Sequence, residues 1–197
     1  MKREPTSAHH HVFDTAIGPC AVAWNDRGLS AVQLPEKDRA TTERRLVAKA
    51  ASAGAAEPPP AIAAVVADIQ RCLAGEAVDF AAVAVDLSGL DPFRRKLYET
   101  MRSLPWGETT TYGDLAKKLG ATGWEGARDV GEAMGRNPVP VVIPCHRVLA
   151  AGGKTGGFSA PGGIVTKLRL LTIEGAQPGG PTLFDRLPLV APRRRSR

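Results

Sequence analysis

Three prolines within one short apolar segment constrain the fold of this chain more than any other feature. They stand at 138, 140 and 144 in the run NPVPVVIPCHRV, which extends from Asn137 to Val148. Each proline fixes φ and removes a backbone hydrogen-bond donor, so the β-branched residues between them do not suit an ordinary ladder strand. The pattern predicts a short, buried, rigid segment that holds the next residue, Cys145, at a defined point.

Cys145 is followed directly by His146 and Arg147. Cysteine acts as a nucleophile in its thiolate form, and a neighbouring imidazole or guanidinium favours that form. A single buried cysteine is more often a small hydrophobic residue, and we prefer that interpretation for Cys20 and Cys72. For Cys145, the two neighbours and the rigid lead-in favour a reactive thiol.

The pattern upstream of this segment is helical. Asp91-Pro92 opens an amphipathic helix whose apolar residues stand at 93, 97, 101 and 104. Thr111, with Asp114 three residues later, resembles a capping box at the start of a short helix over 112–119. A turn over 121–123 leads to a second helix at about 124–135. Two short helices joined by a glycine-containing turn predict a helix-turn-helix, a motif that often binds DNA.

The second of these helices is rich in small residues: Gly126, Ala127, Gly131, Ala133 and Gly135. Each glycine costs about 1 kcal/mol of helix stability relative to alanine. Two explanations remain open, namely tight packing against another helix and close approach to a bound partner.

Positive charge accompanies the Cys145 segment. The 197 residues carry a formal net charge of +6, divided as −2 over 1–90 (9 basic, 11 acidic), +4 over 91–178 (12 basic, 8 acidic) and +4 over 179–197 (5 basic, 1 acidic). This distribution suits a polyanionic partner such as nucleic acid, although a solvated basic face explains it equally well.

Cysteine usage and hydropathy indicate a protein of a reducing compartment. Three cysteines are too few for a disulfide framework, no apolar run reaches the ~18 residues that span a bilayer, and no leader follows Met1. We therefore expect a cytoplasmic protein without membrane association. His9-His10-His11 could chelate a metal, but no spaced Cys/His set accompanies it, so we expect neither a metal nor a cofactor.

We interpret the N-terminal part of the chain as a supporting unit. Residues 1–10 are expected to form a flexible leader, and three alternating apolar segments between 11 and 34 predict an antiparallel meander. Alanine-rich helices are expected over 39–53 and 60–74, and strand-like spacing returns over 78–87. Because no residue of 11–90 suggests chemistry, this half is predicted to support the other.

The run Pro144-Cys145-His146-Arg147-Val148, with its lead-in Asn137 to Pro140, resembles the active-site signature of the O6-alkylguanine-DNA alkyltransferases, or methylated-DNA–protein-cysteine methyltransferases. The resemblance extends from about Asp91 to Gly175 and more weakly through the N-terminal part. It implies an α/β (α+β) fold. A small N-terminal antiparallel sheet with helices, ribonuclease-H-like, would occupy 11–90. A mostly helical, winged-helix-like domain with the helix-turn-helix would occupy 91–178.

The same resemblance implies catalytic roles. Cys145 would accept the alkyl group, and His146 would draw its proton through a water molecule. Glu174, in Ile173-Glu174-Gly175, would orient and charge His146. Asn137 would hold the turn that presents Cys145, and Tyr112 would donate to guanine N3 as the purine leaves.

Further residues would bind DNA and the extruded base. In the family, the small-sided helix enters the minor groove, and Arg128 matches the residue that fills the gap left by an extruded nucleotide. The implied DNA-binding residues are Arg128, Ala127, Gly131, Thr111 and Met134. The implied base pocket consists of Val148, Phe158 and Ser159.

The chain departs from the family in its pocket loop. Phe158 stands where tyrosine is common, and Ala160-Pro161 is inserted before a glycine pair. The closing helix over 163–174 is expected to turn Ile164, Leu168 and Leu171 inward, with Lys167 and Arg169 outward. Residues 179–197 are expected to be a disordered basic tail, in which the segment 182–185 is a candidate for weak docking to a partner.

The implied function is a single-turnover repair reaction. The partner would be double-stranded DNA containing O6-alkylguanine, with O4-alkylthymine as a further substrate, and the protein would act as a monomer. The alternative is a protein that flips the alkylated base and recruits repair factors without transfer. Family members of that type lack the signature cysteine, which this chain retains. A hydrolase using Cys145 is disfavoured because nothing marks an acyl pocket.

Overall fold

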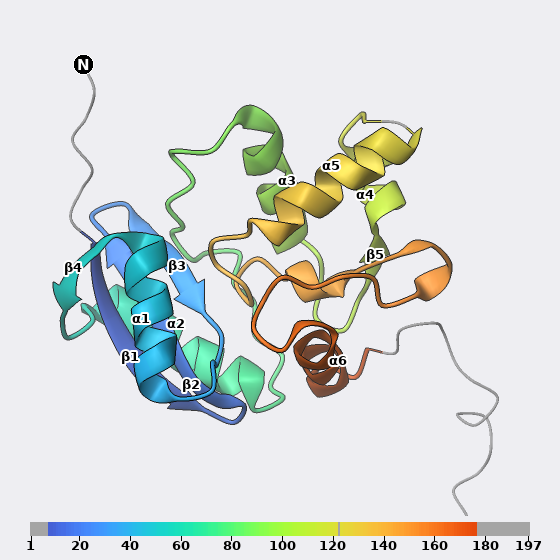
Figure 1. Cartoon of the computed structure of the whole chain (residues 1–197). Helices are drawn as coiled ribbons and strands as arrows, with labels where there is room; N and C mark the ends of the chain where they lie inside the picture. The colour runs from blue at the N-terminus through green and yellow to red at the C-terminus, as the bar shows by residue number, and fades with distance from the viewer. Residues whose placement is uncertain (1–7, 122, 177–197) are drawn as a thin grey trace, which may run out of the picture.

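The N-terminal half is a four-stranded sheet between two helices. The computed structural model describes residues 8–121 and 123–176 (Figure 1). The first half contains β1 (Ala8–Thr15), β2 (Gly18–Asn25), β3 (Gly28–Gln33), α1 (Arg39–Ala50), β4 (Ser52–Ala55) and α2 (Pro60–Leu73). The strand order is β3-β2-β1-β4. The predicted antiparallel meander of β1, β2 and β3 is confirmed.

Four local predictions for this half were wrong. β4 pairs with β1 in parallel, so the sheet is mixed rather than wholly antiparallel. β1 begins at Ala8, so residues 8–10 belong to the sheet rather than to a leader. The segment 78–87 forms no strand and adds only one bridge, between Leu29 and Val85, because its backbone meets the β3 chain at a single point. The first helix also ends earlier than expected, since Ala51 turns into a left-handed conformation with φ of 47°.

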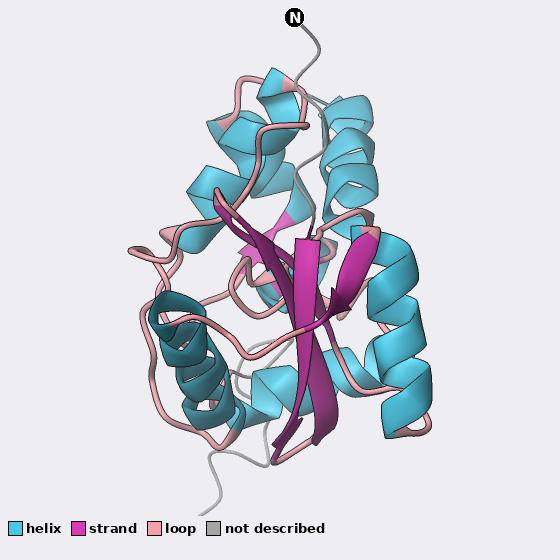
Figure 2. Ribbon diagram, turned by 90° about the vertical axis from the view of Figure 1, so that its left-hand side faces the viewer, coloured by secondary structure: helices cyan, strands magenta, loops and turns pink. Residues whose placement is uncertain are grey.

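Side-chain size decides which helix covers which face of the sheet. Ala21, Ala23 and Ala31 form one face and pack under Leu46 of α1. The larger side chains alternate onto the other face, where they join the main core with α2. Figure 2 shows the two helices on opposite sides of the strands.

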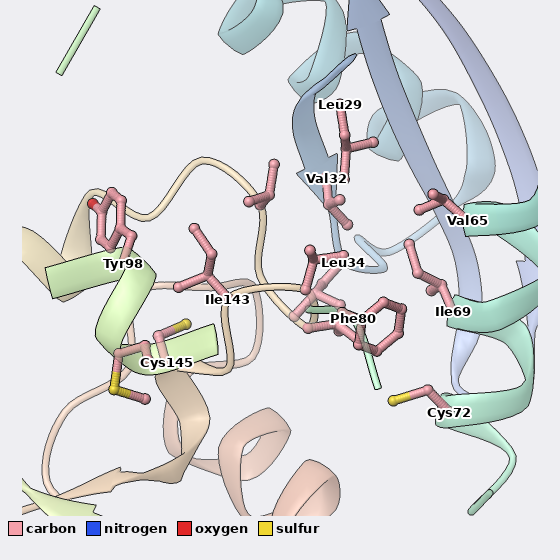
Figure 3. Close-up of a cluster of buried hydrophobic side chains, with 14 of the residues drawn as sticks. Leu29, Val32, Leu34, Val65, Ile69, Cys72, Phe80, Tyr98, Ile143 and Cys145 are labelled. Carbon is pink, nitrogen blue, oxygen red and sulfur yellow. The ribbon is translucent and has the colours of Figure 1, made fainter. Parts of the chain in front are cut away.

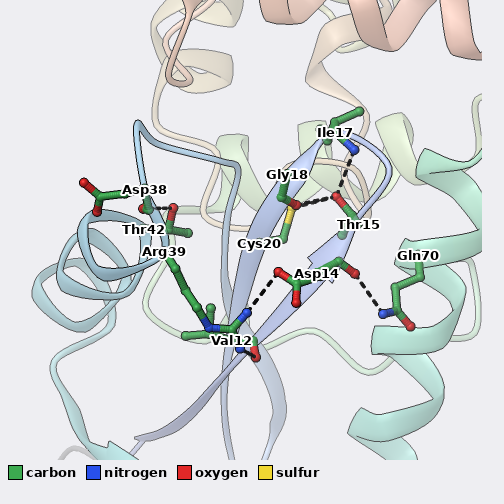
Figure 4. Close-up of polar contacts among 10 residues, drawn as sticks. All are labelled: Val12, Asp14, Thr15, Ile17, Gly18, Cys20, Asp38, Arg39, Thr42 and Gln70. Atoms are coloured by element: carbon green, nitrogen blue, oxygen red, sulfur yellow. Dashed lines mark hydrogen bonds and ion pairs between the residues drawn. The ribbon is translucent and has the colours of Figure 1, made fainter.

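Polar contacts at one end of β1 fix both helices to the sheet (Figure 4). Arg39 of α1 donates to Asp14 Oδ1 at 3.0 Å and to the Val12 carbonyl at 2.6 Å. Gln70 of α2 donates to the Asp14 carbonyl at 2.9 Å. One end of β1 therefore fixes the positions of both helices relative to the sheet.

The C-terminal half is helical and contains the predicted helix-turn-helix. Its elements are α3 (Pro92–Arg102), β5 (Thr110–Thr111), α4 (Tyr112–Lys118), α5 (Gly123–Gly135), the 3₁₀ turns η1 (Cys145–Arg147) and η2 (Ala151–Gly153), β6 (Val148–Leu149) and α6 (Gly163–Ile173). Asp91 caps α3 with Pro92 in its first turn, as predicted. The predicted cap of α4 is confirmed, since Thr111 Oγ1 accepts from the Asp114 amide at 3.1 Å.

One hydrophobic core joins the two halves. Figure 3 shows Val32 and Leu34 near the end of β3, with Ile69 of α2 on one side and Ile143 on the other. The same cluster of buried residues includes Cys145. The N-terminal sheet therefore packs directly against the proline-rich segment and supports it.

The orientation of α6 differs from the prediction. Lys167 is fully buried, whereas Ile164 and Leu168 are 51% and 40% exposed; only Leu171 is buried as expected. The helix turns Lys167 inward because backbone carbonyls there accept hydrogen bonds from its ammonium group. Arg169 points outward, as predicted, and donates to the Ala16 and Ile17 carbonyls of the β1–β2 turn.

None of the helices in the described ranges is long and apolar enough to cross a membrane.

Candidate active site around Cys145

Asn137 organises the segment that carries the thiol. Its side-chain Nδ2 donates to the Ile143 carbonyl at 2.8 Å, and its Oδ1 accepts from the Val139 amide at 3.0 Å. Between these anchors Val141 has φ of 76°, a left-handed conformation that is costly for a β-branched residue. Such strain persists only where the surroundings enforce it. The predicted rigid support is thus a turn clamped by one amide side chain.

Cys145 lies at the meeting point of two cavities. It is the first residue of η1 and is 7% exposed. Burial raises the pKa of its thiol, while the Asn137 amide and the positive charges of Lys167 and Lys49 act in the opposite direction. Burial therefore disfavours the thiolate, which is the reactive form, and a nearby base that takes the thiol proton would offset this cost.

His146 and Glu174 form a buried pair next to the thiol residue. His146 Nε2 lies 2.8 Å from Glu174 Oε1, and the two side chains are 1% and 3% exposed. Although burial opposes ionisation, hydrogen bonds from His146 and Arg147 lower the pKa of Glu174 to about 2. Burial lowers the pKa of His146, and Glu174 partly restores it. Among the described residues, His146 Nδ1 has no hydrogen-bond partner.

Arg147 has a different role from the one its position suggested. Its guanidinium forms two hydrogen bonds with Glu174 instead of contacting the thiol. Nε lies 2.7 Å from Oε2, and Nη2 lies 2.9 Å from Oε1. A further bond at 2.6 Å reaches the Leu104 carbonyl. Successive residues of a 3₁₀ turn point in directions about 120° apart, which separates these side chains from that of Cys145.

Two lysines that sequence reasoning missed supply the positive charge near the thiol. Lys167 Nζ donates to the Val148 carbonyl at 2.6 Å and the Gly157 carbonyl at 3.3 Å, and burial lowers its pKa to about 8. Lys49 Nζ, from α1, donates to the Pro138 carbonyl at 2.8 Å. Neither lysine lies in a motif, so only the tertiary structure identifies them. The N-terminal half therefore contributes a charged group to the site.

A cavity of about 430 Å³ opens between α5 and the loop after η2. It is lined by Tyr112, Gly131, Met134, Gly135, Cys145, Gly157, Phe158 and Ser159. Phe158 and Ser159 occupy the wall predicted for the base pocket, and Ser159 Oγ fixes its loop to α5 by donating to the Gly135 carbonyl at 2.9 Å.

Val148 and Met134 are both buried. Val148 is fully buried, and its carbonyl accepts a hydrogen bond from Lys167 Nζ at 2.6 Å, so its place in the base pocket stays a prediction. Met134 is 4% exposed and lines the cavity, and its contact with DNA stays a prediction. The α-helical period explains the burial of Met134, because it follows Gly131 by three residues and shares its inward face.

Tyr112 lies at the edge of this cavity. Burial raises the pKa of its hydroxyl, which is 3.5 Å from the Gly157 carbonyl. Lys167 Nζ lies 5.8 Å from the centre of its ring. A neutral phenol at this point can donate a hydrogen bond to a bound ring nitrogen.

The outer face of α5 presents Arg128. Its side chain is 67% exposed, and its guanidinium lies 5.2 Å from the ring centre of Trp124, an indole that is itself 70% exposed. Ala127 is half-buried, as is Thr111 at the cap of α4. Of the small residues, Gly126 is explained by packing, since a Cβ there would lie 3.0 Å from the Ala121 backbone. Gly131 has more room and faces Tyr112.

The histidine triplet lies in β1, away from this site. His10 is buried, with its ring nitrogens 2.8 Å from Ser52 Oγ and 3.0 Å from Glu43 Oε1. Within residues 8–121 and 123–176, no three His, Cys, Asp or Glu side chains gather in a way that could hold a metal ion.

The fold and the site define a protein that presents a buried thiol, next in sequence to a buried His146–Glu174 pair, beside a helix-turn-helix. Residues 92–176 match the family described as "6-O-methylguanine DNA methyltransferase, DNA binding domain". The methylated-DNA–protein-cysteine methyltransferase of Mycobacterium tuberculosis is 34% identical over 90% of this chain and 99% of its own length. The chain belongs to the methylated-DNA–protein-cysteine methyltransferase family.

Two further comparisons bear on DNA. A crystal structure of M. tuberculosis OGT in complex with DNA superposes with a TM-score of 0.65 at 34% identity, covering 84% of this chain and 92% of that one. A DNA base-flipping protein of Thermus thermophilus is 42% identical over 55% of this chain and 69% of its own length.

Proposed function

We propose that this protein repairs DNA by transferring the alkyl group of O6-alkylguanine in a duplex to Cys145. The observation that carries the proposal is the position of the Cys145 thiol, in the wall of a cavity that adjoins the helix-turn-helix. Guanine O6 is out of reach of a buried thiol while the base is stacked, so the nucleotide must leave the duplex and enter this cavity. The relatives' names and the DNA complex of a similar structure support the same conclusion.

In the proposed reaction, His146 removes the Cys145 proton through a water molecule, and Glu174 stabilises the resulting imidazolium. Sγ then attacks the alkyl carbon, the S–C bond forms as the C–O6 bond breaks, and the electron pair goes to the purine. Tyr112 offsets the developing negative charge by donating to N3. Asn137 holds the thiol in line.

The reaction ends in a thioether, which water does not hydrolyse. We therefore infer that each molecule acts once, without a cofactor. O4-alkylthymine would follow the same route, because it too carries its alkyl group on an exocyclic oxygen.

DNA binding is assigned to the helix-turn-helix. Arg128 is exposed on α5 and free to fill the gap left by the extruded nucleotide, which offsets part of an unstacking cost of a few kcal/mol. Ala127, Gly131 and Thr111 would form the low surface that enters the minor groove, and Phe158 and Ser159 would flank the base.

Finer features are proposals of the same kind. We propose that residues 8–90 form a ribonuclease-H-like unit and 91–176 a winged-helix-like unit, and that the protein is a cytoplasmic monomer. All three cysteines are free and buried, which suits a reducing compartment. The candidate docking segment at 182–185 and the basic tail around it lie outside the described residues.

The test is a mass measurement. The protein is incubated with a short duplex carrying one O6-methylguanine, and intact and peptide masses are recorded. We expect one added methyl group per molecule, on the Cys145 peptide, and none in Cys145→Ala. Tight lesion binding without a mass change would instead establish a base-flipping protein that recruits other factors.

A further inference from the structure

Cys145 borders a second cavity, on the side that faces the N-terminal half. This cavity measures about 350 Å³, and its walls include Lys49 of α1, Arg136 after α5, and the inserted Ala160-Pro161. It shares Gly135, Cys145, Phe158 and Ser159 with the cavity proposed for the base. The two cavities therefore adjoin at the thiol.

Substitution geometry determines what can enter the second cavity. The attacking sulfur, the alkyl carbon and the leaving O6 must lie nearly in line, so the other substituents of that carbon project sideways from this axis. With the purine in the first cavity, a substituent longer than methyl needs space beside Cys145. The second cavity offers that space.

The charge of the second cavity is positive. Besides Cys145, its ionisable lining consists of Arg45, Lys49, Arg136 and a single carboxylic acid, Glu36. Glu36 is paired with Arg45 at 3.4 Å, so its charge is already balanced. Arg136 is paired with Glu132, at 2.8 Å, on the surface of α5.

Lys49 is the cation best placed to act on a ligand. Its Nζ donates only to backbone carbonyls: Pro138 at 2.8 Å, Val32 at 3.2 Å and Asn137 at 3.5 Å. In the part of the chain that the structure describes, no carboxylate lies within 4.0 Å of it. Burial lowers the pKa of Lys49 to about 8, so the ammonium form still predominates at pH 7, and Lys49 lines the thiol cavity without a carboxylate partner among the described residues.

We propose that the second cavity binds the alkyl substituent and selects substituents that carry a negative charge, with Lys49 as the specificity-determining residue. The simplest such lesion is O6-carboxymethylguanine, whose carboxylate would face the Lys49 ammonium while Sγ attacks the adjacent methylene. The S–CH₂ bond forms, the CH₂–O6 bond breaks with its electron pair going to the purine, and the Cys145 proton passes to His146. The inference rests on the proposed alkyl transfer.

The experiment compares two lesions of nearly the same shape. Duplexes carry either O6-carboxymethylguanine or its neutral amide, O6-carbamoylmethylguanine, and the rate of thioether formation is measured for each by mass spectrometry. The ratio of the two rates isolates the charge, because both substituents have the same branched shape and an activating carbonyl. An O6-methylguanine duplex, run in parallel, tests alkyl transfer itself.

We expect Lys49→Met to lower the charged-to-neutral rate ratio about threefold to fivefold, the size of a partly exposed ion pair. Lys49→Arg should keep most of the ratio, and raised salt should reduce the ratio in the wild type. Lys37→Met removes the same charge from an exposed site outside this cavity and should leave the ratio unchanged.

Failure of the proposed function and failure of the specificity proposal give different results. A wild-type protein that transfers neither methyl nor carboxymethyl would refute the proposed function. A wild-type protein that transfers methyl, but whose rate ratio is unchanged in Lys49→Met, would overturn the specificity proposal alone. A loss of both rates in equal proportion would assign Lys49 to holding the Asn137-Pro138 turn.

Discussion

Glu174 Oε1 lies 2.8 Å from His146 Nε2 and 2.9 Å from Arg147 Nη2, so one carboxylate oxygen contacts the buried side chains of two adjacent residues. The same carboxylate that orients the base also balances the charge of a buried arginine. Catalysis and stability are therefore coupled at Glu174.

Glu174→Gln should lower the free energy of unfolding by about 3 kcal/mol, because it leaves the Arg147 guanidinium buried without a countercharge. Urea denaturation at pH 7 measures the effect. Glu132→Gln is the matched control, since that residue pairs with Arg136 at an exposed site and should change stability by less than about 1 kcal/mol. Equal effects of the two substitutions would contradict the role assigned to Glu174.

The pH dependence of stability has a defined sign. Because the pKa of Glu174 is about 2 in the folded protein against 4.5 ordinarily, its contribution is present above pH 4.5 and is lost as the pH falls towards 2. Thermal unfolding of wild type and Glu174→Gln, followed from pH 6 to pH 2.5, should show the two melting temperatures converging at the acid end. A constant difference between the two melting temperatures would show that the partners of Glu174 do not lower its pKa.

Lys167→Met should raise the pKa of the Cys145 thiol. The substitution removes a buried ammonium whose charge favours the thiolate. Iodoacetamide alkylation of Cys145, followed by peptide mass, should slow severalfold at pH 7 and recover at high pH, because a smaller fraction of the thiol is then ionised at neutral pH. Lys154→Met, at an exposed position, serves as the control. A slower reaction at every pH would point to a packing defect.

Two glycines of α5 should respond in opposite ways to alanine. Gly126→Ala places a Cβ 3.0 Å from the Ala121 backbone and should destabilise the protein by about 1–3 kcal/mol through overpacking. At Gly131 the Cβ would meet only the Tyr112 ring, at 3.9 Å, so the substitution should stabilise the helix by up to about 1 kcal/mol. Gly131→Ala should nevertheless slow repair, because the methyl group narrows the cavity. Thermal denaturation and methyl-transfer rates test both variants, and destabilisation by Gly131→Ala would contradict the geometry.

Trp124 should support Arg128 in DNA binding. An exposed cation–π contact is worth about 0.5–1 kcal/mol, so Trp124→Ala should weaken binding to a lesion duplex about twofold to fivefold. Trp124→Phe should retain much of the affinity. Both are measured in a Cys145→Ala background, in which transfer cannot occur. Tighter binding by Trp124→Ala would show that the indole holds Arg128 away from DNA.

Local sequence patterns predicted most of the elements. Proline and capping residues gave correct starts for α3 and α4, and the small residues marked α5. These signals depend on neighbours in the chain, so they can be read without the fold. The strand expected over 78–87 was wrong because alternation alone does not guarantee a pairing partner.

The residues of the site differ in whether the sequence or the tertiary structure identified them. The sequence alone placed His146 next to Cys145 on a proline-fixed segment, and the family resemblance predicted that Asn137 holds this turn, which its hydrogen bonds to Ile143 and Val139 agree with. Only the tertiary structure decided that Arg147 belongs to Glu174, that Lys167 turns inward on α6, and that Lys49 reaches the site from α1. A long flexible lysine side chain carries no pattern of its own. Its role depends on which carbonyls the packed elements bring within its reach.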